Sequence, residues 1–120
     1  MRGRKRGRLA RYDLIPVKPL WMVAEVYGIG ASKYESRNWE LGYEYSQAYA
    51  ALQRHLQQYW GGEDYDVGGQ HHLASVIFHC MSLMEWAETH PEHDDRPRKV
   101  ELESEVTYDP ATVTKPWRIV

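Results

Sequence analysis

The sequence predicts a small, mainly α-helical protein with one domain, and three observations predict it. The chain has 120 residues, which is enough for one modest hydrophobic core. Two segments, residues 45–60 and 70–89, carry apolar side chains at helical spacing. The short loop between these segments would make the two helices antiparallel neighbours. We therefore expect a helical domain built on an antiparallel helix hairpin.

An extended basic arm, residues 1–18, is expected to precede this domain. Only one carboxylate, that of Asp13, occurs before residue 21. The cations of the same stretch are Arg2, Arg4, Lys5, Arg6, Arg8, Arg11 and Lys18. Pro16 and Pro19 favour extended backbone before them. Such an arm can contact nucleic acid, reach over a phosphate or dock on an acidic subunit, or it can be a solvated tail.

The helical domain is expected to span residues 19–98. Its first helix should run from about residue 20 to 27 and end at Gly28 and Gly30, before a polar stretch at 31–42. The helix at 45–60 carries one apolar face, formed by Ala48, Leu52, Leu56 and Tyr59. The helix at 70–89 also carries apolar side chains on one side, namely Leu73, Val76, Ile77, Cys80, Met84 and Ala87. Residues 99–120 are expected to form an extended C-terminal tail.

The composition excludes several classes of protein. Cys80 is the only cysteine, so neither an internal disulfide nor a cysteine-based zinc site can form. No apolar run approaches the ~20 residues that span a bilayer, and no signal-peptide pattern is present. We therefore expect a cytoplasmic protein without a membrane partner. Nine Tyr and five Trp against one Phe favour interfaces and base-stacking pockets over a dry core.

The hairpin predicts a candidate metal site. His55 lies near the end of one helix and His72 near the start of the next, so a rise of about 1.5 Å per residue keeps both close to the loop. The loop supplies Glu63, Asp64 and Asp66. Two imidazoles and three carboxylates can bind Mg²⁺ or Mn²⁺, and histidine favours Mn²⁺. The alternative is a solvated acidic turn beside two structural histidines.

A second cluster predicts a nucleotide site. It consists of Lys33, Tyr34, Arg37, Asn38 and Trp39. It offers two cations for phosphate, flat rings for a base and an amide for a base edge. Arg54 adds a cation beside His55. The alternative is that Trp39 anchors the core and the charged groups are solvated.

Several short motifs occur in a specific order. They are RYDLIP (11–16), GASKY (30–34), RNW (37–39), RHL (54–56), GEDYD (62–66) and HLA (72–74). Over roughly residues 11–88 the chain resembles a phage and prophage family, the dATP/dGTP diphosphohydrolase N-terminal domain. The resemblance implies a helical protein of phage purine-nucleotide metabolism, acting in the cytoplasm of a bacterial host. It also implies metal-dependent hydrolysis of a deoxypurine triphosphate.

The chain also departs from related patterns. It is only distantly similar to the helical MazG-like pyrophosphohydrolases, since Glu63-x-x-Asp66 fits one of their acidic pairs and Glu85-x-x-Glu88 fits the other poorly. The family often has a longer acidic turn where residues 67–70 stand here, and a second histidine where this chain has Ser75. These changes remove metal ligands and so affect catalysis more than binding.

Three functions are compatible with these observations. The first is a nucleoside triphosphate diphosphohydrolase or pyrophosphohydrolase, with Glu63, Asp66 and His55 as catalytic residues and one or two metal ions. The second is a non-catalytic sponge that sequesters a cyclic nucleotide or an ADP-ribose-type immune signal, which is an anti-defence role. The third is nucleic-acid binding through the arm, which the acidic remainder disfavours. The small core and large aromatic content also predict a homo-oligomer.

Overall fold

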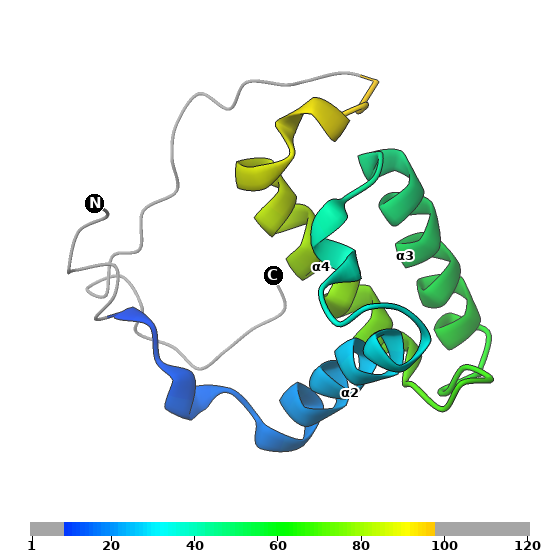
Figure 1. Ribbon diagram of the computed structural model, residues 1–120. Helices are drawn as coiled ribbons and strands as arrows, with labels where there is room; N and C mark the ends of the chain where they lie inside the picture. The colour runs from blue at the N-terminus through cyan, green and yellow to red at the C-terminus, as the bar shows by residue number, and fades with distance from the viewer. Residues whose placement is uncertain (1–8, 98–120) are drawn as a thin grey trace, which may run out of the picture.

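The fold is organised around one central helix. The computed structural model describes residues 9–97, and it contains three α-helices, α2 (Val17–Lys33), α3 (Tyr45–Trp60) and α4 (His72–Thr89). α4 packs against both α3 and α2, and α3 and α4 run in opposite directions (Figure 1). Three short 3-10 helices, η1 (Tyr12–Leu14), η2 (Asn38–Leu41) and η3 (Pro91–His93), complete the described chain, in which no strand forms. The predicted mainly helical hairpin domain is confirmed.

The structure describes the helical domain and leaves out both ends of the chain. Residues 1–8 of the predicted arm and residues 98–120, which include the predicted tail, lie outside the described residues. None of the helices within 9–97 is both long and apolar enough to cross a lipid bilayer.

α2 is longer than its sequence pattern predicts. It continues through Gly28 and Gly30 to Lys33, so the prediction that it ends at these glycines was wrong. A glycine inside a helix costs about 1 kcal/mol relative to alanine, which weakens a helix without ending it. The carbonyl of Gly30 accepts a hydrogen bond from the backbone N–H of Tyr34 at 2.9 Å, which closes the last turn. Lys33 is thereby held at the helix end.

α3 has the bounds that its sequence pattern predicts, but a distant residue caps it. The backbone N–H of Ser46 donates to Oδ1 of Asp95 at 2.9 Å, and the Ser46 hydroxyl donates to the other carboxylate oxygen. These hydrogen bonds lower the pKa of Asp95 below its ordinary value. A carboxylate at a helix N-terminus also interacts favourably with the helix dipole. The segment after α4 is therefore fixed to the start of α3.

The hydrophobic core lies at one end of the contact between α3 and α4. Trp86 is 1% exposed and packs with Ala48 and Tyr45. The indole N–H of Trp86 donates to the carbonyl of Trp39 at 3.2 Å, and the Tyr45 hydroxyl lies 2.9 Å from the Trp86 carbonyl oxygen and donates to it. The Tyr43 ring meets the indole edge to face, with centroids 4.9 Å apart. This core ties the segment before α3 to the last turns of α4.

The apolar side of α4 does not form this core. Ile77, Met81 and Met84 are exposed, and Leu73 and Val76 are only half-buried. The buried side chains of α4 are instead His72, Ala74, Ser75, His79, Ser82 and Trp86. Helical periodicity identifies two faces of a helix but not which of them meets its neighbours. In α4 the face directed at α3 and α2 is largely polar. Burying a polar group lowers the stability of the fold unless the group has a hydrogen-bond partner, so such a face is retained where it is hydrogen-bonded or has a function.

Candidate functional site

A carboxylate and two histidines form a chain of contacts where α3 and α4 meet the loop between them. Oε1 of Glu63 lies 2.7 Å from Nε2 of His72, and Nδ1 of His72 lies 2.8 Å from Nδ1 of His55. A carboxylate only accepts, so Nε2–H of His72 donates to Glu63. In the neutral form of His72, Nδ1 is then an acceptor, and Nδ1–H of His55 donates to it. Both imidazoles are buried, His72 completely.

The loop from Gly61 to His71 closes on itself and thereby positions these groups. The backbone N–H of His72 donates to the carbonyl of Asp64, and that of Asp66 donates to the carbonyl of Gln70, both at 2.9 Å. Gly62 and Gly69 adopt positive φ angles of 105° and 95°, which glycine reaches without strain. The side chain of His71 caps α4 by accepting the N–H of Leu73. The carboxylates of Glu63 and Asp66 are consequently folded back toward the two helices.

Asp66 completes a set of potential metal ligands. A carboxylate oxygen of Asp66 and one ring nitrogen each of His55 and His72 lie within 4.8 Å of one another. Within residues 9–97, this set does not include the carboxylates of Glu63 and Asp64. Glu63 instead contacts Nε2 of His72, the nitrogen that faces away from His55, and a carboxylate in this position can orient an imidazole that binds a metal through its other nitrogen. Asp64 contributes its backbone carbonyl, and its side chain is exposed.

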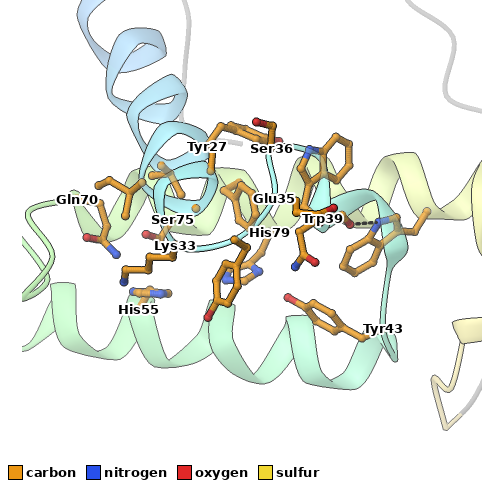
Figure 2. A pocket seen from close by; sticks show the side chains of 18 residues that line it. Tyr27, Lys33, Glu35, Ser36, Trp39, Tyr43, His55, Gln70, Ser75 and His79 are labelled. Atoms are coloured by element: carbon orange, nitrogen blue, oxygen red, sulfur yellow. Dashed lines mark hydrogen bonds between the residues drawn. The ribbon is translucent and has the colours of Figure 1, made fainter.

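A cavity of about 530 Å³ adjoins this cluster. It is bounded by α2, the segment from Tyr34 to Tyr43, His55 of α3, and α4. Figure 2 shows Lys33, His55 and Gln70 toward one end of the cavity and Trp39 and Tyr43 toward the other. Its volume lies in the range of small-molecule sites. One end is therefore polar and cationic, and the other is aromatic.

The cavity collects most of the predicted nucleotide-binding residues. Lys33, Tyr34, Asn38 and Trp39 all line it. The backbone carbonyl of Trp39 also accepts the hydrogen bond from the buried Trp86 indole. Trp39 therefore both anchors the core and lines the cavity.

Two predicted cations lie outside the described cavity lining. Arg37 is exposed, and its guanidinium forms an ion pair with Glu40 at 2.8 Å. Arg54 is also exposed. Its charge nevertheless acts on the site, because it helps lower the pKa values of His55 and His79. The structure thus does not bring these two guanidinium groups into the cavity lining.

Two polar residues of the cavity were missed by the sequence interpretation. Nδ1 of His79 and Oε1 of Gln70 are buried without a hydrogen-bond partner, and both residues line the cavity. Burial, followed by the charges of His55 and Arg54, lowers the pKa of His79 to about 4. The sequence signal was the spacing of His72, Ser75 and His79 at i, i+3 and i+7, which places them on one face of α4. An unpaired polar atom facing a cavity is available to a ligand.

The electrostatics favour the uncharged form of two imidazoles of the site, His55 and His79. The pKa of His55 is lowered, first by burial and then by Arg54 and His72, while Asp66 acts in the opposite direction. A neutral imidazole has one nitrogen with a free lone pair, which can bind a metal ion or accept a proton. The cluster can therefore hold a cation beside a cavity that has room for a ligand.

Comparisons with known proteins identify the family. No curated protein matches the chain significantly, and no solved structure does. The family described as dATP/dGTP diphosphohydrolase, N-terminal, matches residues 2–96 of the 120. The family name points to a nucleotide-related hydrolase. The match includes every residue of the cluster and of the cavity, and the chain belongs to the dATP/dGTP diphosphohydrolase, N-terminal, family.

Proposed function

We propose that this chain binds dATP or dGTP in the cavity and hydrolyses a phosphoanhydride bond with the help of Mn²⁺ or Mg²⁺. One observation carries the proposal: the cluster of His55, His72 and Asp66 adjoins the cationic end of a cavity whose other end is aromatic. A nucleotide has the same polarity, with a flat base at one end and phosphates at the other. The family name supports the same substrate class.

The spacing of the two imidazoles supports an octahedral ion. Ligands at 2.0–2.1 Å in adjacent octahedral positions are about 2.9 Å apart, and the two Nδ1 atoms are 2.8 Å apart. For both to act as ligands, His55 must carry its proton on Nε2, so that each Nδ1 presents a lone pair. Glu63 already holds His72 in that form. Imidazole together with carboxylate favours Mn²⁺ over Mg²⁺.

The remaining residues have separate roles in this proposal. The metal ion would lower the pKa of a bound water and offset the charge on the phosphates. Lys33 binds phosphate at the cationic end, and Asn38 contacts a base edge. Tyr34 or Trp39 stacks on the purine.

The two arginines outside the lining have a more limited part. Arg54 neighbours His55 on α3 and would meet phosphates that extend out of the cavity. Arg37 would first have to leave Glu40. We therefore assign the charge stabilisation of the reaction mainly to Lys33 and the metal ion.

An experiment with purified protein tests the proposal. The chain is incubated with dATP or dGTP and Mn²⁺, Mg²⁺ or EDTA, and products are separated by anion-exchange chromatography and identified by ³¹P NMR. Glu63→Gln should lower turnover by about 10- to 100-fold, because it removes the group that orients His72. Glu25→Gln, the same substitution at an exposed position of α2, should leave turnover unchanged. Equal rates in both variants would show that Glu63 has no part in the reaction.

A binding function without turnover is the second candidate. Ser75 is buried in the cavity lining at a position where a histidine would supply another ligand. The chain would then sequester a nucleotide-derived signal, such as a cyclic nucleotide or an ADP-ribose derivative. Heat denaturation of a loaded complex distinguishes the two: intact nucleotide indicates a sponge, and cleaved nucleotide indicates an enzyme.

We also propose that a second copy of this chain covers the apolar side of α4. Five hydrophobic side chains are buried within residues 9–97, whereas Ile77, Met81 and Met84 are exposed together on α4. So small a core leaves an apolar face that association of two copies would bury. Light scattering coupled to gel filtration should give a dimer or larger assembly, and Met84→Glu should dissociate it. A monomeric parent protein at micromolar concentration would exclude this interface.

A further inference from the structure

A second cluster of histidines and carboxylates lies at the opposite end of α4. It contains His90, which follows the helix, and Glu92 and His93 of η3. The 18 residues of α4 span about 27 Å. The cluster is therefore separate from the site at His72, and the proposed nucleotide chemistry makes no use of it.

The geometry within this cluster resembles that of a metal site. Oε2 of Glu92 lies 3.0 Å from Nδ1 of His90 and 3.9 Å from Nε2 of His93. One potential ligand atom from each of the three residues lies within 4.8 Å of the other two. Ligands at 2.0–2.1 Å from a tetrahedral zinc ion are about 3.3 Å apart, a value that the two measured distances bracket. Only a small movement of His93 would be needed to close the site.

A hydrogen bond at one ring nitrogen of His90 determines which of its two nitrogens can bind a ligand. Nε2 of His90 donates to the carbonyl of Glu40 at 2.7 Å. In a neutral imidazole Nδ1 then carries a lone pair, and this lone pair faces the carboxylate of Glu92. Two acceptors in contact repel each other unless a proton or a metal cation lies between them, so this position attracts a cation. A hydrogen bond from the far nitrogen to a carbonyl is also the usual arrangement of a ligating histidine.

The far nitrogen of His93 also has an oxygen neighbour, although the two atoms are too far apart for a hydrogen bond. Its Nδ1 lies 3.8 Å from Oε2 of Glu44, a second carboxylate on the outer side of the cluster. Both imidazoles also pack on Gly42, where a Cβ atom would come within 3.0 Å of His90 and 3.1 Å of His93. The backbone from Glu40 to Glu44 thus supports the two rings from one side and leaves their near nitrogens directed at Glu92.

We infer that His90, Glu92 and His93 form a second metal site, which binds Zn²⁺ through two imidazoles and one carboxylate. Two histidines, one glutamate and an open fourth position are an established donor set for zinc. An ion there would fasten η3 to the segment from Glu40 to Glu44. That segment contains Tyr43 and directly follows Trp39, and these two residues line the aromatic end of the cavity. Zinc at this site would therefore order the wall against which a base is proposed to stack.

Titration of the full-length chain with Zn²⁺ tests this inference. The protein is treated with EDTA, dialysed and titrated by calorimetry, and Co²⁺ is used in parallel as a spectroscopic probe. The double variant Glu92→Gln/His93→Gln removes two ligands and keeps the hydrogen bond from His90 to Glu40. It should bind one Zn²⁺ fewer per chain than the parent and lose the intense visible absorption of tetrahedral Co²⁺. The control variant Glu25→Gln/Glu85→Gln removes two exposed carboxylates that belong to neither cluster and should bind as the parent does.

The first site is tested apart from the second. His55→Gln/His72→Gln removes the ligands at the start of α4, so any zinc bound at His90 remains in that variant. Crystals grown with Zn²⁺ should show an anomalous peak between His90, Glu92 and His93. Unchanged stoichiometry in Glu92→Gln/His93→Gln, or a parent protein that only protonates His90 and binds no ion there, would overturn the inference. Neither result bears on turnover of dATP or dGTP.

Discussion

Acid should destabilise this protein through His79. The pKa of this imidazole is lowered to about 4 in the folded chain, from an ordinary value of 6.5. Between these two pH values the unfolded chain carries a proton on His79 and the folded chain does not. Because the unfolded state binds more protons, the free energy of unfolding falls as the pH falls through this window.

The size of the effect follows from the same two values. At 1.36 kcal/mol for each pKa unit, the full difference corresponds to at most about 3.4 kcal/mol. Water in the adjoining cavity screens part of this cost, so we expect a loss of about 2 kcal/mol between pH 7.5 and 4.5. The pKa of His55 is also lowered, and it adds a loss of the same sign. His90, whose pKa is raised by Glu92 and the Glu40 carbonyl, contributes in the opposite sense.

Comparison with His79→Phe isolates the one residue. Urea unfolding is followed by far-UV circular dichroism at pH 7.5, 6.0, 5.0 and 4.5 for both proteins. The contribution of His90 is common to both proteins and cancels in the difference. The variant should be at least as stable as the parent at pH 4.5, because it also removes a buried nitrogen that has no partner. His71→Asn, which keeps an acceptor at the N-cap of α4, serves as a control. Parallel pH profiles for parent and His79→Phe would refute the reasoning.

Three further predictions concern the fold. Ala48→Leu should lower the free energy of unfolding by about 1–3 kcal/mol, because Ala48 is completely buried against Trp86 and a larger side chain has no space. Denaturant unfolding measures this change, and an unchanged free energy of unfolding would show that α3 and α4 can separate. Asp95→Ala should lower the melting temperature by a few degrees, because the hydrogen bonds to Ser46 at the start of α3 are lost. Asp95→Asn should retain most of the parent's stability, and equal losses in both variants would show that the charge of Asp95, and not its hydrogen bonds, stabilises α3. Trp86→Phe should loosen the segment around Trp39, because it removes the indole N–H that donates to the Trp39 carbonyl. Hydrogen exchange of the backbone amides at residues 39–44 should become faster, and unchanged exchange would refute this prediction.

The sequence predicted the elements that depend on local pattern. The bounds of α3 and the pairing of α3 with α4 followed from apolar spacing and a short glycine-rich loop. The same pairing fixed the proximity of His55, His72, Glu63 and Asp66, since a hairpin leaves them no other place. That these groups lie together was therefore predictable. Their role as metal ligands remains a prediction.

Other features depend on contacts between distant residues and could not be predicted locally. Asp95 caps α3 across a separation of 49 residues, which no local pattern indicates. The orientation of α4 was also beyond reach, since its apolar and polar faces have the same period. Only the position of α2 and α3 decides which face is covered.

The orientation of α4 also explains why the candidate site occurs where it does. α4 contacts both other helices, so polar side chains on that face are shielded from water from two directions. Shielding is what lowers the pKa values of His55 and His79 and keeps their lone pairs available. It also costs stability, which the apolar end at Trp86 must offset. The contact between α3 and α4 is thus divided along its length. One end, around Trp86, holds the helices together, and the other, around His72, holds the buried imidazoles beside the cavity.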